Sequence, residues 1–350
     1  MAKVMAAMSG GVDSSVVAAI LKEQGHSTLG ATLRLVEDGG VLSKEVLSAW
    51  EVCQKLGIPH IVYDMREDFK KEIIARFINE YEAGLTPNPC VECNKYIKFG
   101  GMLKKAILEN CDYIATGHYS KVSFNKETGR YTVTRPKDFK KDQTYVLWQL
   151  SQEQLSHILM PLGELTKEEV REIAADYGFS SAGAKDSQDI CFVPDGNYAA
   201  FIQSHTGEIF KKGNYTDIYG KVLGQHLGHQ CYTIGQRKGL GIALGKPQFV
   251  ISKDPLTNNV VLGDEEHIFK THIYIKDINM MALEFPKGDI ACTAKLRYSA
   301  RDEECIFHPL SETEAVLEFK KPQRAATPGQ SAVLYLDDLL LGGGKIVNGE

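Results

Sequence analysis

The chain has few cysteines, no long apolar run and no excess of positive charge, and each of these shortages excludes a class of protein. Eight cysteines in 350 residues are too few for a disulfide-held secreted domain. The sequence contains no stretch of about 18 apolar residues, so we expect no membrane span. The formal net charge of −5 gives no general attraction to nucleic acid. We therefore expect a folded cytoplasmic protein, without a signal peptide because a structured motif follows directly from Met8.

The length and the order of the predicted elements indicate more than one domain. A chain of 350 residues exceeds the roughly 250–300 residues at which a single core stops growing. Strands are predicted over residues 28–35, 60–65 and 112–116, and helices over 45–56, 68–81 and 95–109. This alternation predicts a mostly parallel sheet, which binds ligands beyond the carboxyl ends of its strands.

The character of the sequence changes near residue 205. Before this point a hairpin is predicted over 121–135 and a helix over 166–177, which begins with a capping box of Thr166 and Glu169. After it, short β-type runs separated by glycine, asparagine and aspartate dominate. We predict a doubly wound α/β domain over residues 1–205, a small β-rich central domain over 206–268 and a C-terminal β-barrel over 269–350.

A glycine turn between a predicted strand and a predicted helix lies at the amino end. The apolar run Val4–Met8 precedes Ser9–Gly11, and a helical pattern begins at Val12. Glycine lets the backbone approach an anion, which the N–H groups of the first helical turn attract. Asp13 is expected to cap the helix or to hold a magnesium ion. The segment lacks the Gly-Lys-Ser/Thr of a Walker A loop. The alternative to a phosphate-binding loop is a purely structural glycine turn, in which Asp or Ser caps the helix.

Three cysteines have charged rather than apolar neighbours in the sequence. Cys90 and Cys93 lie in a proline-containing segment just before the predicted helix that carries Lys98, and Cys191 follows Lys185. A helix N-terminus and nearby cations lower the pKa of a thiol, so we expect reactive thiolates. This pattern favours sulfur chemistry in which one thiol carries a persulfide and another releases the sulfur.

A metal site is the alternative use of the same thiols. A structural zinc site needs four ligands, and no nearby histidine pair supplies the fourth. A [4Fe–4S] cluster held by Cys90, Cys93 and Cys191, with one iron open to sulfide, competes with the persulfide route. The sequence leaves this choice open.

Taken together, the motifs resemble those of the bacterial tRNA-specific 2-thiouridylase family, within the superfamily of PP-loop ATP pyrophosphatases. The glycine turn is similar to the SGGxDS loop with which these enzymes split ATP into AMP and pyrophosphate. The resemblance implies a PP-loop or HUP-like fold for the first domain. Its segments run nearly end to end: MSGGVDSS at 8–15, TPNPCVECNKYIKF at 86–99, DYIATGHY at 112–119, KDQTYVL at 141–147, KDSQDICF at 185–192, GQRKGLGI at 235–242, KLRYSA at 295–300, TPGQSAVLY at 327–335 and LGGG at 341–344.

The resemblance also implies roles for individual residues. Cys93 matches the attacking cysteine and Cys191 the persulfide-bearing cysteine, and the reaction would join the two in a disulfide bond. The residues expected at ATP are Ala7, Met8, Ser9, Gly10, Gly11, Val12, Asp13, Ser14, Leu33 and Gly117. The residues expected at tRNA or the target base are Asn88, Pro89, Cys90, His118, Lys141, Asp142, Gln143, Arg297, Tyr298 and Gln330.

The reaction and the partners follow from the same resemblance. An ATP-dependent sulfurtransferase is expected, which uses ATP with Mg²⁺ to adenylate O2 of the wobble uridine of tRNA. Sulfur then displaces AMP at C2. The expected acceptors are the tRNAs for lysine, glutamate and glutamine, and a persulfide-carrying protein is the expected sulfur donor. The uridine has to leave the anticodon stack to reach the site.

Two departures from the family pattern are visible. Cys90 stands where other members have aspartate, which removes a carboxylate and adds a third thiol. The segment Ala31–Leu35 lacks the methionine and the final tryptophan common in relatives, and the acidic loop after it is shortened, so the adenine pocket is expected to differ. The rival functions are an amide-forming PP-loop ligase, which needs no cysteine pair, and a non-catalytic RNA- or metal-binding protein.

Overall fold

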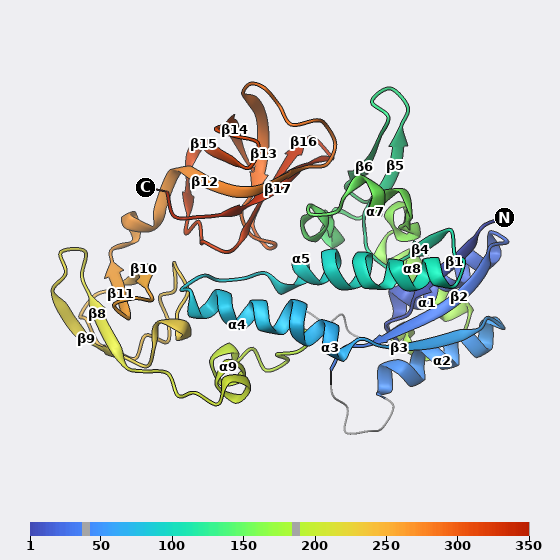
Figure 1. Ribbon diagram of the computed structural model, residues 1–350, viewed down its shortest axis with the longest axis horizontal. Coiled ribbons are helices and arrows are strands. Elements are labelled where there is room, and N and C mark those ends of the chain that lie inside the picture. Colours follow the sequence, from blue (N-terminus) through green and yellow to red (C-terminus); the bar gives the residue numbers. More distant parts are fainter. Residues whose placement is uncertain (37–42, 184–189, 350) are drawn as a thin grey trace.

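A five-stranded parallel sheet forms the amino-terminal part of the molecule (Figure 1). The computed structural model describes residues 1–36, 43–183 and 190–349. Along β1, Val4 and Ala6 face one core cluster and Met5 faces another, as alternating strand residues do. The strand order is β3-β2-β1-β4-β7, with β1 at Lys3–Ala7, β2 at Ser27–Arg34, β3 at His60–Asp64, β4 at Tyr113–Ala115 and β7 at Ile158–Leu159.

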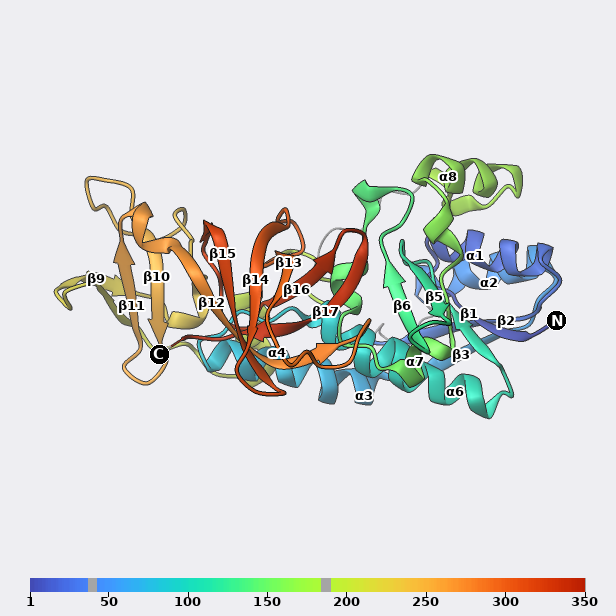
Figure 2. The ribbon, with the colours of Figure 1, turned by 90° about the horizontal axis from the view of Figure 1, so that it is seen from above.

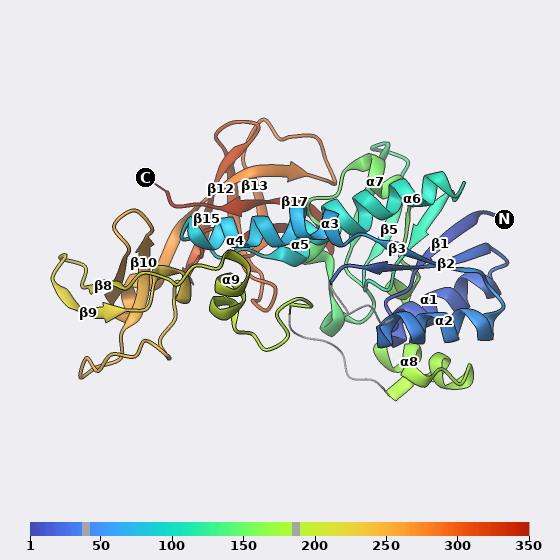
Figure 3. The ribbon, with the colours of Figure 1, turned by 60° about the horizontal axis from the view of Figure 1, so that its bottom comes forward.

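Helices cover both faces of this sheet, which confirms the predicted α/β fold. Figure 3 shows α1 (Val12–Glu23), α2 (Lys44–Leu56) and α8 (Lys167–Asp176) on one side of the strands and α6 (Met102–Leu108) on the other. The first three helices share one buried cluster, while α6 contributes to the second. The capping box predicted at Thr166 is present at the start of α8.

Two long helical runs extend from the sheet toward the β-rich part (Figures 1 and 2). The first consists of α3 (Arg66–Phe69), the π-helical η1 (Lys70–Ile74) and α4 (Ala75–Glu82), and the second of α5 (Pro89–Cys93), the π-helical η2 (Asn94–Gly101) and α6. The second run begins at Pro89 and not near residue 95, so the predicted start is wrong. The Asn88 side chain accepts a hydrogen bond from Cys90 N at 3.2 Å, and proline fits the first helical position.

A four-stranded sheet follows in the middle of the chain. Its strand order is β10-β11-β8-β9, and β11 pairs with β8 in parallel while the other pairs are antiparallel. Helix α9 (Tyr198–Thr206) precedes it in the chain. The strands are β8 (Gly213–Thr216), β9 (Val222–His226), β10 (Phe249–Asp254) and β11 (Asn259–Gly263).

The carboxyl-terminal strands form the predicted closed antiparallel barrel, because β12 pairs with both β15 and β17. The predicted hairpin of β5 (Lys121–Asn125) and β6 (Arg130–Thr134) is also present, and β6 extends the barrel sheet by pairing with β17. The barrel strands are β12 (Phe269–Met280), β13 (Ile290–Lys295), β14 (Glu303–Pro309), β15 (Glu314–Arg324), β16 (Ser331–Leu336) and β17 (Leu339–Ile346).

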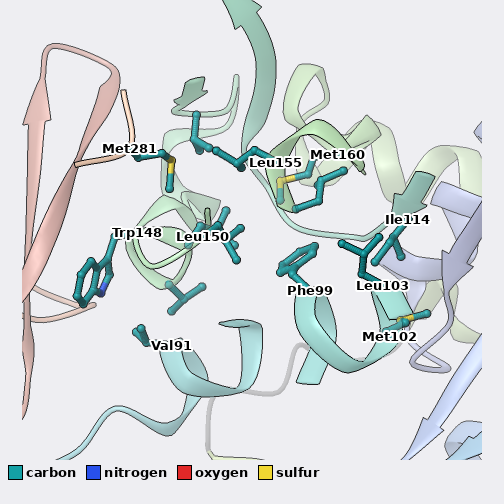
Figure 4. Packing of buried hydrophobic residues seen from close by; sticks show 14 of the residues in the cluster. Val91, Phe99, Met102, Leu103, Ile114, Trp148, Leu150, Leu155, Met160 and Met281 are labelled. Carbon is teal, nitrogen blue, oxygen red and sulfur yellow. The ribbon is translucent and has the colours of Figure 1, made fainter. Parts of the chain in front are cut away.

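A buried cluster connects the parallel sheet to the barrel (Figure 4). Phe99 and Leu103 of the second helical run pack with Leu150, and Trp148 lies toward the barrel strands, where its Nε1 donates to Ser331 Oγ at 2.9 Å. The remaining short elements are η3 (Phe139–Lys141), η4 (Thr144–Leu147), α7 (Gln152–Ser156), η5 (Pro161–Glu164), η6 (Ser180–Gly183), η7 (His229–Cys231) and η8 (Glu265–Ile268). Among the described residues, no helix is long and apolar enough to cross a membrane.

Candidate active site

The turn between β1 and α1 requires glycine and is held by serine hydroxyls. Gly10 has a φ of +75°, and a Cβ there would lie 2.5 Å from the carbonyl oxygen of Glu45. Ser14 Oγ donates to the Gly11 carbonyl at 3.0 Å, and Ser48 Oγ donates to the Gly10 carbonyl at 3.0 Å. Because the N–H groups of a first helical turn have no partner within the helix, this turn is suited to bind phosphate oxygens.

Other residues expected at ATP surround the turn. Gly117 follows β4, and a Cβ there would lie 3.0 Å from Asp13 Cβ and 3.2 Å from Ser14 N. Glycine at this position therefore allows the end of β4 to approach the start of α1. Ser9 N donates to Ser14 Oγ at 3.2 Å, and Leu33 is half-buried. Three more of the expected residues pack in the buried clusters on the faces of the sheet: Ala7, Met8 and Val12.

Asp13 pairs with a lysine and does not cap its helix. The N-cap residue is Gly11, without a side-chain capping bond. Lys167 Nζ donates to the two carboxylate oxygens of Asp13 at 2.7 and 2.8 Å, and the Tyr119 hydroxyl donates to Oδ1 at 2.9 Å. The expected capping role is therefore wrong. Since both oxygens already accept from an ammonium group, Asp13 does not offer a free ligand for magnesium.

Cys90 and Cys93 occupy the first turns of the second helical run. Cys90 is exposed, whereas Cys93 is 9% exposed and packs in a cluster with Phe69, Phe77 and Phe192. That cluster joins the two helical runs to the segment that carries Cys191. Cys191 itself is exposed, and residues 185–189 of the motif around it lie outside the described residues.

The three thiols share one electrostatic environment. Burial raises the pKa of Cys93 to about 12, Lys98 lowers it in part, and Cys191 and Cys90 raise it further. The pKa values of Cys90 and Cys191 are also raised: both are exposed, but surrounding protein atoms displace much of the water near their sulfurs. The expected thiolates are therefore wrong for this state, because the loss of hydration outweighs the helix terminus and Lys98.

The eight cysteines are all free, so the expected disulfide is not present. Among the described residues, which include Cys90, Cys93 and Cys191, no three His, Cys, Asp or Glu side chains are grouped closely enough to hold a metal ion. This absence concerns a single metal ion, whereas the effects of Cys90, Cys93 and Cys191 on one another's pKa values show that the three thiols are neighbours.

His118 connects the nucleotide turn to the thiols. It directly follows Gly117, its Nδ1 lies 2.8 Å from Thr116 Oγ1, and its ring packs on Phe99 with the centroids 5.7 Å apart. Burial, and next the charge of Lys98, holds the pKa of His118 well below its ordinary value, so the ring is neutral. The charge of Lys98 thus lowers the pKa values of His118 and of all three thiols.

Several residues expected to contact tRNA are held by hydrogen bonds within the protein. Arg297 Nη2 donates to Ala325 O at 2.8 Å, and Gln330 Nε2 donates to Thr86 O at 2.8 Å. Asp142 is buried and accepts from the Thr144 hydroxyl at 2.6 Å, while Gln143 Oε1 accepts from Tyr119 N at 2.9 Å. Tyr298 is 46% exposed. Asn88 and Lys141 are half-buried, and Pro89 is buried.

Sequence reasoning missed three charged residues around the site. Lys167 was visible only as part of the capping box, and Glu92 only as the residue between two cysteines. Lys345 directly follows the LGGG segment at 341–344 and was assigned no role. The role of each residue depends on an ion pair with a residue far away in the sequence: Lys167 pairs with Asp13, and Glu92 pairs with Lys345.

Comparison with known proteins identifies three matching family models. Their descriptions are a tRNA methyl transferase HUP domain over residues 2–195, a tRNA methyl transferase PRC-barrel domain over 199–264 and an aminomethyltransferase beta-barrel domain over 270–346. These descriptions refer to methyl transfer, whereas the curated relatives carry a different name.

Those relatives match over nearly the full chain. A tRNA-specific 2-thiouridylase MnmA of Clostridium perfringens is 47% identical and one of Moorella thermoacetica is 49% identical, each over 98% of both chains. Among solved structures, a 4-thiouridine synthetase in complex with RNA and ATP aligns at 16% identity with a TM-score of 0.35, over 55% of this chain and 45% of that one. This last similarity is too weak to support an argument.

Proposed function

The chain belongs to the tRNA-specific 2-thiouridylase family, and we propose that it catalyses ATP-dependent 2-thiolation of the wobble uridine of tRNA. Relatives at 45–49% identity over nearly the whole chain carry that name, so thiolation takes precedence over the methyl transfer in the descriptions of the family models. As a member of this family the protein is a tRNA-modifying sulfurtransferase that uses ATP.

The observation that carries the proposal is the common environment of the nucleotide turn and the thiols. Gly117 lies against the start of α1, and His118 next to it is acted on by Lys98. The same lysine acts on Cys93 and Cys191. An amide-forming ligase would have no use for thiols in this position, and a non-catalytic binding protein would have no use for a glycine turn of this geometry.

We propose two chemical stages. In the first, the uridine O2 attacks the α-phosphorus of ATP, pyrophosphate leaves, and N–H groups at the start of α1 stabilise its charge. In the second, the Cys93 thiolate attacks the inner sulfur of a persulfide on Cys191. This forms a Cys93–Cys191 disulfide and releases hydrosulfide. Hydrosulfide attacks C2, and AMP leaves with the former O2. A dithiol or thiol reductant is then required to restore both cysteines.

We propose the persulfide route, which needs only the free thiols of Cys93 and Cys191, and keep the [4Fe–4S] cluster on Cys90, Cys93 and Cys191 as the alternative. Magnesium is proposed to arrive with the phosphates of ATP, since Asp13 is paired with Lys167. The proposed acceptors are the tRNAs for lysine, glutamate and glutamine, and the proposed sulfur donor is a persulfide-carrying protein. The cytoplasm is the proposed compartment, because tRNA is available there.

The residues proposed to hold the target base are Asn88, Pro89 and Cys90, at the start of α5. The division into residues 1–205, 206–268 and 269–350 is kept as our proposal for the domains. The β-rich parts are proposed to bind the anticodon stem, whose shape rather than sequence would be recognised.

The test is an assay with anaerobically purified protein, ATP, a persulfide donor and an unmodified tRNA with a wobble uridine. We expect pyrophosphate release and one 2-thiouridine per tRNA, detected by mass spectrometry of nucleosides. Iron analysis of the same sample distinguishes the two routes. Full thiolation by iron-free protein supports the persulfide route, and thiolation only in proportion to bound iron contradicts it.

A further inference from the structure

The helix that carries the two cysteines is tied to the C-terminal barrel by an ion pair. Glu92 lies between Cys90 and Cys93 on α5, and its side chain is 9% exposed. Lys345 Nζ on β17 lies 3.0 Å from Glu92 Oε1 and 3.1 Å from Glu80 Oε1 on α4. One barrel lysine therefore contacts both helical runs. Gln149 Nε2 donates to the same Glu92 oxygen at 3.2 Å, which fixes the carboxylate from a second direction.

The backbone before this helix is held by the same barrel. Thr86 N donates to Pro328 O at 2.9 Å, and Gln330 Nε2 donates to Thr86 O and Pro87 O at 2.8 and 3.2 Å. Gly329 has a φ of +93°, and a Cβ there would lie 2.9 Å from Thr86 N. The barrel loop thus approaches the segment before α5 as closely as glycine permits.

These contacts fix different degrees of freedom of α5. The hydrogen bonds to Thr86 and Pro87 set the position of the start of the helix. α5 continues directly into η2, and the packing of Val91 and Cys93 sets its rotation on the buried side. The ion pair at Glu92 adds a restraint on that rotation from the side of the barrel. Because successive helical residues are separated by a fixed angle, fixing Glu92 also fixes the direction of the adjacent Cys93 side chain.

We propose that Lys345, through Glu92, is a positioning residue that aims the Cys93 sulfur at the persulfide of Cys191. The proposal rests on the proposed function and deepens it: the barrel is part of the sulfur-transfer machinery and not only a surface for tRNA. Lys345 itself touches no reacting atom. Its effect is on the step that uses Cys93, and adenylation by the nucleotide turn does not depend on it.

The test compares Lys345→Met with Glu80→Gln in the full-length protein. Lys345→Met removes both ion pairs of this lysine, whereas Glu80→Gln removes only the pair with Glu80 and leaves Glu92 paired. We expect Lys345→Met to lower kcat for thiolation at least about tenfold, with the KM for tRNA within about twofold, because small misplacements of reacting groups are costly. Glu80→Gln is expected to keep kcat within about twofold. Lys345→Arg keeps the positive charge. It is expected to retain most of the wild-type activity that Lys345→Met loses.

A second readout does not depend on thiolation. The rate at which iodoacetamide alkylates Cys93, followed by peptide mass spectrometry without tRNA, is expected to rise at least about fivefold in Lys345→Met and in Glu92→Gln but not in Glu80→Gln. If wild-type protein does not thiolate tRNA, the proposed function fails, while this alkylation contrast still tests the positioning.

Two results would overturn the proposal. One is an unchanged kcat and an unchanged Cys93 alkylation rate in Lys345→Met. The other is an equal loss of kcat in Lys345→Met and Glu80→Gln that follows their loss of thermal stability, which would assign Lys345 a purely structural role. Should Lys345→Met fail to fold, Glu92→Gln decides by the same criteria.

Discussion

Individual residues of the nucleotide turn were predictable where a local rule applied. Gly10 has a positive φ and a crowded Cβ position, and the glycine pair between a strand and a helix indicated such a turn. The partner of Asp13 was not predictable, because Lys167 lies 154 residues away in the sequence. The raised pKa of Cys93 was not predictable either. It results from burial, which depends on tertiary packing and not on the neighbours of Cys93 in the sequence.

The glycine turn gives a prediction with a matched control. Gly10→Ala is expected to lower the free energy of unfolding by about 1–3 kcal/mol, because alanine would adopt a left-handed conformation and contact the Glu45 backbone. Gly11 has a φ of −89°, and a Cβ there would lie 3.6 Å from Ser9 Oγ. Gly11→Ala should therefore cost less than about 1 kcal/mol. Urea unfolding of both variants measures this, and equal losses would contradict the account.

The raised pKa of Cys93 gives a prediction on pH dependence. Burial raises the pKa of this thiol to about 12, so its thiolate fraction is small at neutral pH and increases with every unit of pH up to that value. The alkylation rate of Cys93 in free enzyme should rise about tenfold per pH unit between roughly pH 7 and 10. Peptide mass spectrometry after timed alkylation follows this rate. A plateau near pH 8 would show an ordinary thiol.

The type of most helices and strands was predictable from the sequence, but their first and last residues were less so. The parallel strands, α2 and the hairpin of β5 and β6 follow from periodicity and turn residues. The start of α5 was misplaced because proline and asparagine suggest a loop, although both are also favoured at a helix start. The helix that supplies the cation for Asp13 depends on how the elements pack. Helix α8 packs against α1, and its Lys167 forms an ion pair with Asp13.

The contact between α8 and α1 gives a prediction at the scale of elements. Lys167→Met leaves the Asp13 carboxylate without its buried cation beside the expected phosphates, so the KM for ATP should increase about tenfold. Lys137→Met removes another ion pair of α8, to Glu169, in which both side chains are exposed. That control should change the KM for ATP by less than about twofold. ATP-dependent pyrophosphate release provides the measurement, and equal effects of the two changes would contradict a role at the nucleotide turn.

At the scale of the whole molecule, the order of an α/β part, a small β-rich part and a closed barrel was predictable from the change in sequence character. The way these parts combine was not. The hairpin strand β6 pairs with β17 of the barrel, and Trp148 packs between the parallel sheet and the barrel. These contacts join residues more than half a chain apart. Gln330, which is expected at tRNA, also supports the segment that leads to the cysteines, through its hydrogen bond to Thr86 O.

We propose that the nucleotide turn and two distant thiols serve one sulfur transfer. The most direct measurement is a single turnover with protein whose Cys191 has been loaded with an isotopically labelled persulfide and freed of excess donor. With ATP and a tRNA carrying a wobble uridine, the account predicts that the label moves to C2 of that uridine, and that neither Cys93→Ser nor wild type without ATP transfers it. Retention of the label on the protein while free sulfide thiolates the tRNA would contradict the account.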